Sequence, residues 1–83
     1  MIEERREFPR QDLFKFGFAV VQESSTTYTC MTLNITERGA KIEVEDSTKL
    51  PDHFLLAARE DETPRPCRVL WRIGPKMGVV FTD

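Results

Sequence analysis

The chain has 83 residues and a formal net charge of −2, a size that accommodates one small domain. Its acidic balance argues against a general nucleic-acid binder, which normally carries a basic excess. It has no long apolar stretch, so we expect neither a signal peptide nor a membrane span, and we expect a cytoplasmic protein. Cys30, Cys67 and the single histidine match no metal-ligand spacing, which predicts two buried free thiols and no metal site.

An arginine cluster opens the chain, with Arg5, Arg6 and Arg10 inside the first ten residues. Pro9 lacks a backbone N–H and disfavours helix before it, so we expect residues 1–12 to form a flexible, extended or turned arm. Guanidinium groups offer a planar fork of donors that suits phosphates and base edges. The alternative is a solvated tail in which the neighbouring glutamates neutralise the arginines.

Six later runs have β-strand character, in chain order 14–20, 26–33, 40–44, 53–59, 67–73 and 77–81. Apolar residues alternate with polar ones in most of them, and turn residues separate them. Periodicity alone leaves the fourth run open between a strand and a short helix. Six short strands in a chain too small for a two-sheet sandwich predict an all-β fold. We expect residues 13–83 to form a six-stranded antiparallel β-barrel, whose closure removes exposed strand edges.

The same alternation predicts which side chains face the barrel interior. The expected inward set is Phe14, Phe16, Phe18, Val20, Ile42, Val44, Val69, Trp71, Val79 and Phe81. On the fifth run, Cys67 and Ile73 are expected on the same face as Val69 and Trp71. Gly17 and Gly78 interrupt strands, which is typical of a bulge, a tight coil or a close backbone approach.

The segment Asn34–Gly39 separates the second and third runs and carries an amide, a hydroxyl and a turn glycine. Asn34 and Thr36 are two residues apart, so in an extended chain their side chains point the same way. Gly39 indicates a left-handed or otherwise strained backbone. An ordinary turn between strands is the alternative. Together with the arginines, this segment predicts a site for an anionic ligand with hydrogen-bonding edges, such as a nucleotide.

Two motifs in this order resemble the paired signature of PilZ domains: Arg5-Arg6-x-x-x-Arg10 and Asn34-x-Thr36-x-x-Gly39. In that family an arginine motif precedes the barrel, and an (Asp/Asn)-x-Ser-x-x-Gly motif lies on its surface. Thr36 stands where the family usually has serine. The run from Cys67 to Phe81 is similar to the closing strands of the family. No C-terminal helix like that of some members is expected.

The resemblance implies a PilZ-like barrel that binds the bacterial second messenger cyclic di-GMP, without catalytic activity or a cofactor. Arg6 and Arg10 would contact phosphates and guanine edges with help from Arg5. Asn34 and Thr36 would bond to a guanine, while the glycine permits close approach. The expected ligand contacts are Arg5, Arg6, Arg10, Asn34, Thr36 and Gly39. Ligand binding would order the arm on the barrel and change the surface offered to an unidentified protein partner.

Other functions stay open at this point. Some PilZ-like domains act as adaptors in pilus or motility assemblies and do not bind the nucleotide. An enzyme would need His53 paired with Cys30 or Cys67, and nothing in the sequence connects them. A small RNA-binding barrel would need basic and aromatic side chains on one outward strand face, whereas here the phenylalanines are expected inside.

Overall fold

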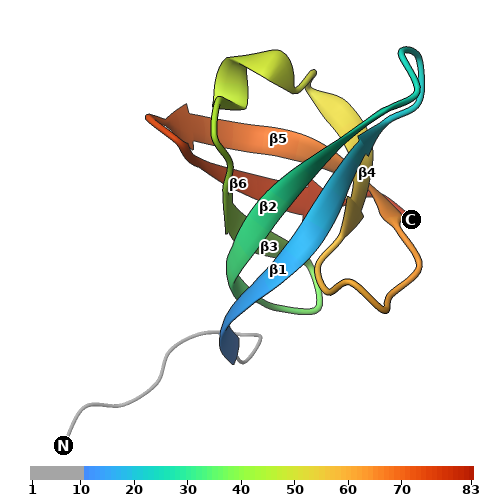
Figure 1. Ribbon diagram of the computed structural model, residues 1–83. Coiled ribbons are helices and arrows are strands. Elements are labelled where there is room, and N and C mark those ends of the chain that lie inside the picture. The colour runs from blue at the N-terminus through green and yellow to red at the C-terminus, as the bar shows by residue number, and fades with distance from the viewer. Residues whose placement is uncertain (1–10) are drawn as a thin grey trace, which may run out of the picture.

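The computed structural model describes residues 11–83, with side chains from residue 14 onward, and shows one closed antiparallel β-barrel (Figure 1). Its strands are β1 (Gln11–Val21), β2 (Thr26–Ile35), β3 (Gly39–Glu43), β4 (His53–Ala57), β5 (Arg65–Ile73) and β6 (Lys76–Phe81). A short 3-10 helix, η1 (Ser47–Lys49), connects β3 to β4, and the described part of the chain contains no α-helix. The all-β, six-stranded antiparallel prediction is confirmed, and the ambiguous fourth run is a strand.

The strand order around the barrel is β1-β2-β3-β6-β5-β4, and all neighbours are antiparallel. The pairing of β1 with β4, from Phe18↔Ala57 to Val20↔Leu55, closes the ring. Closure satisfies backbone groups that an open sheet would leave exposed at its edges. The β2–β3 loop lies at the same end of the barrel as the start of β1 (Figure 1).

The barrel interior is filled mainly by medium-sized apolar side chains. The largest fully buried side chains are Ile42, Leu56, Met77, Thr32 and Cys67. Thr32 is the polar member of this set, and its hydroxyl donates a 2.7 Å hydrogen bond to the carbonyl of Ala58. Among the described residues, no buried side-chain nitrogen or oxygen lacks a partner, as expected for a well-formed core.

The prediction for the inward face of β1 is wrong. The side chains expected inside were Phe14, Phe16, Phe18 and Val20, whereas Gly17, Ala19 and Val21 face inward and are buried. Phe14 is 68% exposed and Phe16 is 55% exposed. The reason is steric: a Cβ on Gly17 would lie 2.2 Å from the carbonyl oxygen of Ala57 on β4. Where β1 and β4 run this close, only small residues fit between them.

The predicted face of β5 is right at its start and wrong at its end. Val69 packs against the core opposite Val79, as expected. A register irregularity then falls between Val69 and Trp71, so that Leu70 is an extra residue and the alternation shifts by one. Trp71 and Ile73 therefore point outward, with exposed fractions of 38% and 71%. Trp71 is not a core residue.

Candidate functional site

Four outward residues form a continuous row across neighbouring strands of the barrel. Asn34 on β2 pairs with Lys41 on β3, Lys41 pairs with Gly78 on β6, and Gly78 pairs with Trp71 on β5. Neighbouring strands are about 4.8 Å apart, so the row extends about 14 Å across the outside of the barrel. These residues come from positions 34 to 78, and only the closed sheet places them side by side.

A shallow groove of about 370 Å³ follows this row, and we call it the outer groove. Its lining residues are Asn34, Thr36, Arg38, Gly39, Ala40, Lys41, Leu70, Trp71, Gly78, Val79 and Val80. Two of them, Arg38 and Lys41, are cationic, and none is a carboxylate. The outer groove therefore offers positive charge and hydrogen-bonding groups beside apolar surface, although the chain as a whole has a net charge of −2.

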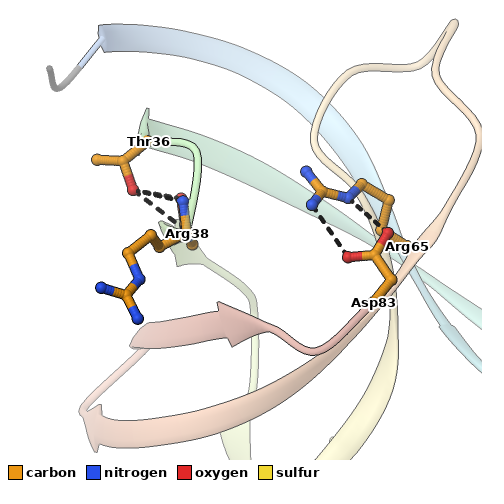
Figure 2. A network of polar contacts seen from close by, with 5 residues as sticks. Thr36, Arg38, Arg65 and Asp83 are labelled. Atoms are coloured by element: carbon orange, nitrogen blue, oxygen red, sulfur yellow. Dashed lines mark hydrogen bonds and ion pairs between the residues drawn. The ribbon is translucent and has the colours of Figure 1, made fainter. Parts of the chain in front are cut away.

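The loop at one end of the outer groove is held by the side chain of Thr36. Its hydroxyl oxygen accepts hydrogen bonds from the backbone N–H groups of Arg38, at 3.1 Å, and Gly39, at 3.2 Å (Figure 2). The N–H of Thr36 donates to the Gly39 carbonyl at 2.8 Å. This is the turn that a threonine side chain forms with the backbone that follows it. In Figure 2 the Arg38 side chain extends away from the Thr36 hydroxyl.

Residue 39 must be glycine because of a close approach between strands, and not because of the left-handed backbone that the sequence predicted. Among the described glycines only Gly74 has a positive φ, so Gly39 is not left-handed. A Cβ on Gly39 would instead lie 2.1 Å from the carbonyl oxygen of Val79 on β6. Strand β6 also bonds to the β2–β3 loop, because the N–H of Phe81 donates to the Arg38 carbonyl at 2.6 Å. Gly39 permits close approach of β3 to β6.

The indole of Trp71 lies at the other end of the row. A Cβ on Gly78 would be 2.1 Å from the indole Nε1 and 2.4 Å from Cε2, so the ring occupies the space above the glycine. A strand glycine commonly marks a place where another group approaches closely. The pairing of Trp71 with Gly78 therefore places one edge of a partly exposed aromatic ring in the outer groove.

The three arginines of the first motif lie outside the described residues. The register of β1 shows where the described part of the chain begins. Gln11 pairs with Ile35, and Asp12 pairs with Asn34. Arg10 is bonded to Gln11, the first described residue, which pairs at the end of β2 beside the β2–β3 loop. The first described residues of β1 thus lie at the same end of the barrel as the second motif.

The described thiols are unsuited to nucleophilic chemistry. Cys30 and Cys67 are free and buried. Burial raises the pKa of Cys30 to about 11 and that of Cys67 to about 12, so both are neutral thiols near pH 7. His53 is exposed at the start of β4. Across residues 11–83, no group of three or more potential ligands is placed to hold a metal ion.

A family model for the PilZ domain matches residues 4–83. The chain belongs to the PilZ domain family. Both motifs of this PilZ domain lie inside the matched region, together with every strand of the barrel. PilZ domains are cyclic di-GMP-binding and effector domains, in other words binding modules and not enzymes. A search of the curated proteins found no match. In the described part of the PilZ domain, no helix is long and apolar enough to cross a membrane.

Part of the outer groove of this PilZ domain was not predicted from the sequence. Asn34, Thr36 and Gly39 were expected to bind ligand and all line the groove. Arg38 and Lys41 also line it but were not among the expected contacts. Arg38 lies inside the second motif, so its position in the sequence already indicated that it could line the site. Lys41 offered no comparable signal, because a polar residue in an alternating strand is ordinary until the neighbouring strands are known.

Proposed function

We propose that this PilZ domain is a receptor for cyclic di-GMP that binds the nucleotide in the outer groove. One observation carries the proposal: the groove combines Asn34 and Thr36 with cationic side chains, and its lining includes no carboxylate among the side chains that the structure describes. The arginine motif directly precedes Gln11, which pairs with Ile35 next to Asn34. Family membership supports the same ligand. An anionic nucleotide with polar base edges is complementary to this combination of groups.

The polar side chains at the end of β2 and in the β2–β3 loop suit a guanine edge. The Asn34 side chain offers both a donor and an acceptor. The Thr36 oxygen already accepts two backbone N–H groups, and its own proton is donated to the Gly39 carbonyl over a long 3.5 Å. Because this hydrogen bond is long and weak, an acceptor on the base can replace it. Arg6 and Arg10, with Arg5, would supply the contacts to the phosphates and the second set of base contacts.

The output would be a change in surface and not a reaction. Cyclic di-GMP would hold the arginine segment against the barrel, and the altered surface would be read by a downstream protein. We place this receptor in the bacterial cytoplasm, where the free thiols of Cys30 and Cys67 stay reduced. Cyclic di-GMP acts here as a ligand, and the proposed function requires no cofactor.

Calorimetric titration with cyclic di-GMP tests the proposal, with GTP and cyclic AMP as controls. We expect selective binding by the native protein and its loss in the double variant Arg6→Ala/Arg10→Ala. Arg59→Ala is the matched control, because Arg59 belongs to neither motif, does not line the outer groove and pairs with Glu62. Trp71 is the single tryptophan and lines the groove, so its emission gives an independent titration curve. Unchanged affinity in the double variant would contradict the assignment.

A second function is favoured by the exposed phenylalanines of β1. Phe14 and Phe16 present large apolar side chains on the outside of the barrel, which is typical of a protein-interaction surface. An adaptor that binds a protein partner and not the nucleotide would use such a surface. If folded protein gives no calorimetric signal with cyclic di-GMP, the adaptor function is favoured. Selective binding of cyclic di-GMP favours the receptor function.

A further inference from the structure

We infer that Lys41, which lies outside both family motifs, binds a phosphate of the ligand at the middle of the outer groove. The inference rests on the proposed function and assigns a contact within the same site. Lys41 has Asn34 on one side and Gly78 on the other in the strand register. Its position is held by the hydrogen-bonded strands β2 and β6, in contrast to a cation on a loop or a terminal segment.

The surroundings of Lys41 leave its charge available to a ligand. Its two cross-strand neighbours are uncharged. The next outward residue of β3 is Glu43, which is opposite Lys76 in the register. Within residues 14–83, Lys41 takes part in none of the ion pairs, which join Arg59 to Glu62, Arg65 to Asp83 and Arg72 to Asp52. An ammonium group on a stem of four carbons can therefore turn toward an anion above the groove.

The spacing of the row fits a ligand with phosphate between two bases. Lys41 is one strand from Asn34, about 4.8 Å, and two strands from Trp71, about 9.6 Å. Gly78 lies between Lys41 and Trp71 in the row and carries no side chain. The edge of the indole occupies the space above it. A base edge bound at Asn34 would place the adjoining phosphate over Lys41. The remaining base would then lie toward Trp71.

The test compares four proteins by calorimetric titration with cyclic di-GMP: the native chain, Lys41→Gln, Lys41→Arg and Lys76→Gln. Loss of a charge-assisted hydrogen bond predicts that Lys41→Gln binds about tenfold more weakly or worse. Lys41→Arg, which keeps the charge, should stay within about threefold of the native affinity. Lys76→Gln removes the same charge from an exposed position outside the groove and should leave binding unchanged. Thermal unfolding of all four proteins should coincide, because Lys41 faces outward.

Salt provides a second readout. A phosphate contact is screened by salt, so the affinity of the native protein should fall more steeply with sodium chloride than that of Lys41→Gln. If the native protein binds cyclic di-GMP and Lys41→Gln binds it within twofold, the inference about Lys41 is overturned and the proposed function stands. If folded native protein does not bind cyclic di-GMP at all, both are overturned.

Discussion

The indole of Trp71 lies over the backbone of Gly78, in the space that a Cβ on residue 78 would occupy. Gly78→Ala should displace the ring, because the added Cβ would lie 2.1 Å from Nε1. Since a side chain can turn away, we expect a shifted Trp71 emission and a loss of about 1–3 kcal/mol in the free energy of unfolding. Urea titration followed by fluorescence measures both. An unchanged spectrum with unchanged stability would show that the ring does not lie over the glycine.

Gly39→Ala should destabilise the barrel more than Gly78→Ala. Its Cβ would meet the carbonyl oxygen of Val79 at 2.1 Å, and backbone in a paired strand cannot turn away as a side chain can. We expect a loss of about 3 kcal/mol or more. Gly74→Ala is the control for glycine replacement as such: its φ is +59° with no atom within 4 Å of the new Cβ, so only the cost of the left-handed backbone, about 1–2 kcal/mol, applies. Equal losses for Gly39→Ala and Gly74→Ala would be inconsistent with the close approach of β3 and β6.

Thr36 should matter through its oxygen and not through its methyl group. Thr36→Val keeps the shape but removes the acceptor for the N–H groups of Arg38 and Gly39. We expect a loss of about 0.5–1.5 kcal/mol in the free energy of unfolding, with a weakened affinity for cyclic di-GMP. Thr36→Ser, which restores the residue usual in the family, should match the native protein in both measurements. Urea unfolding and calorimetry compare the two variants, and equal behaviour would refute a role for the hydroxyl.

The buried hydroxyl of Thr32 connects β2 to the segment after β4. Thr32→Val removes its 2.7 Å hydrogen bond and leaves the Ala58 carbonyl without that donor in the core. We expect a loss of about 1–3 kcal/mol, because a buried unsatisfied carbonyl loses its hydration without compensation. Thr29→Val, on the exposed side of the same strand, is the matched control and should change stability by less than about 0.5 kcal/mol. Similar values for the two variants would exclude a contribution from the buried bond.

The two buried thiols predict a loss of stability in alkaline solution. The ordinary thiol pKa is 9.0, and burial raises it to about 11 for Cys30 and about 12 for Cys67. Below pH 9 the thiols are protonated in both the folded and the unfolded protein, so the free energy of unfolding has its full value. Above pH 9 the unfolded chain releases these protons while the folded protein retains them. The free energy of unfolding should therefore fall by up to about 1.4 kcal/mol per pH unit for each thiol, between pH 9 and about 11 for Cys30 and between pH 9 and about 12 for Cys67.

Denaturant unfolding at several pH values measures this slope. The double variant Cys30→Ala/Cys67→Ala lacks both thiols, so its slope reports every other group that titrates in this range. Its free energy of unfolding should therefore fall less steeply with pH than that of the native protein. A thiol reagent gives a second check: folded protein at pH 7 should resist modification, and unfolded protein should react at both positions. Identical slopes for native and variant protein would contradict the assignment of the effect to the thiols.

The strand count and the approximate strand positions could be predicted because alternation and turn residues are local properties. The strand limits differ by up to three residues, and β1 begins at Gln11 where the sequence predicted residue 14. The Asn34–Gly39 segment could be recognised for the same reason, since its residue types and spacing are visible along the chain. The face of β1 could not be predicted. Phe14 and Phe16 alternate as a buried strand does, yet the close approach of β1 to the Ala57 carbonyl leaves room only for Gly17 and its small neighbours.

The sequence by itself determined an all-β chain with six strands, an acidic net charge, and two motifs in the order of the PilZ family. The tertiary structure decided which side chains meet. Leu70 as an extra residue in β5 turned Trp71 outward, and the register across four strands brought it into line with Asn34 and Lys41. The physical reason is that strand pairing depends on hydrogen bonds and packing between distant segments. One inserted residue reverses every later side chain, and the pattern within a single strand does not reveal it.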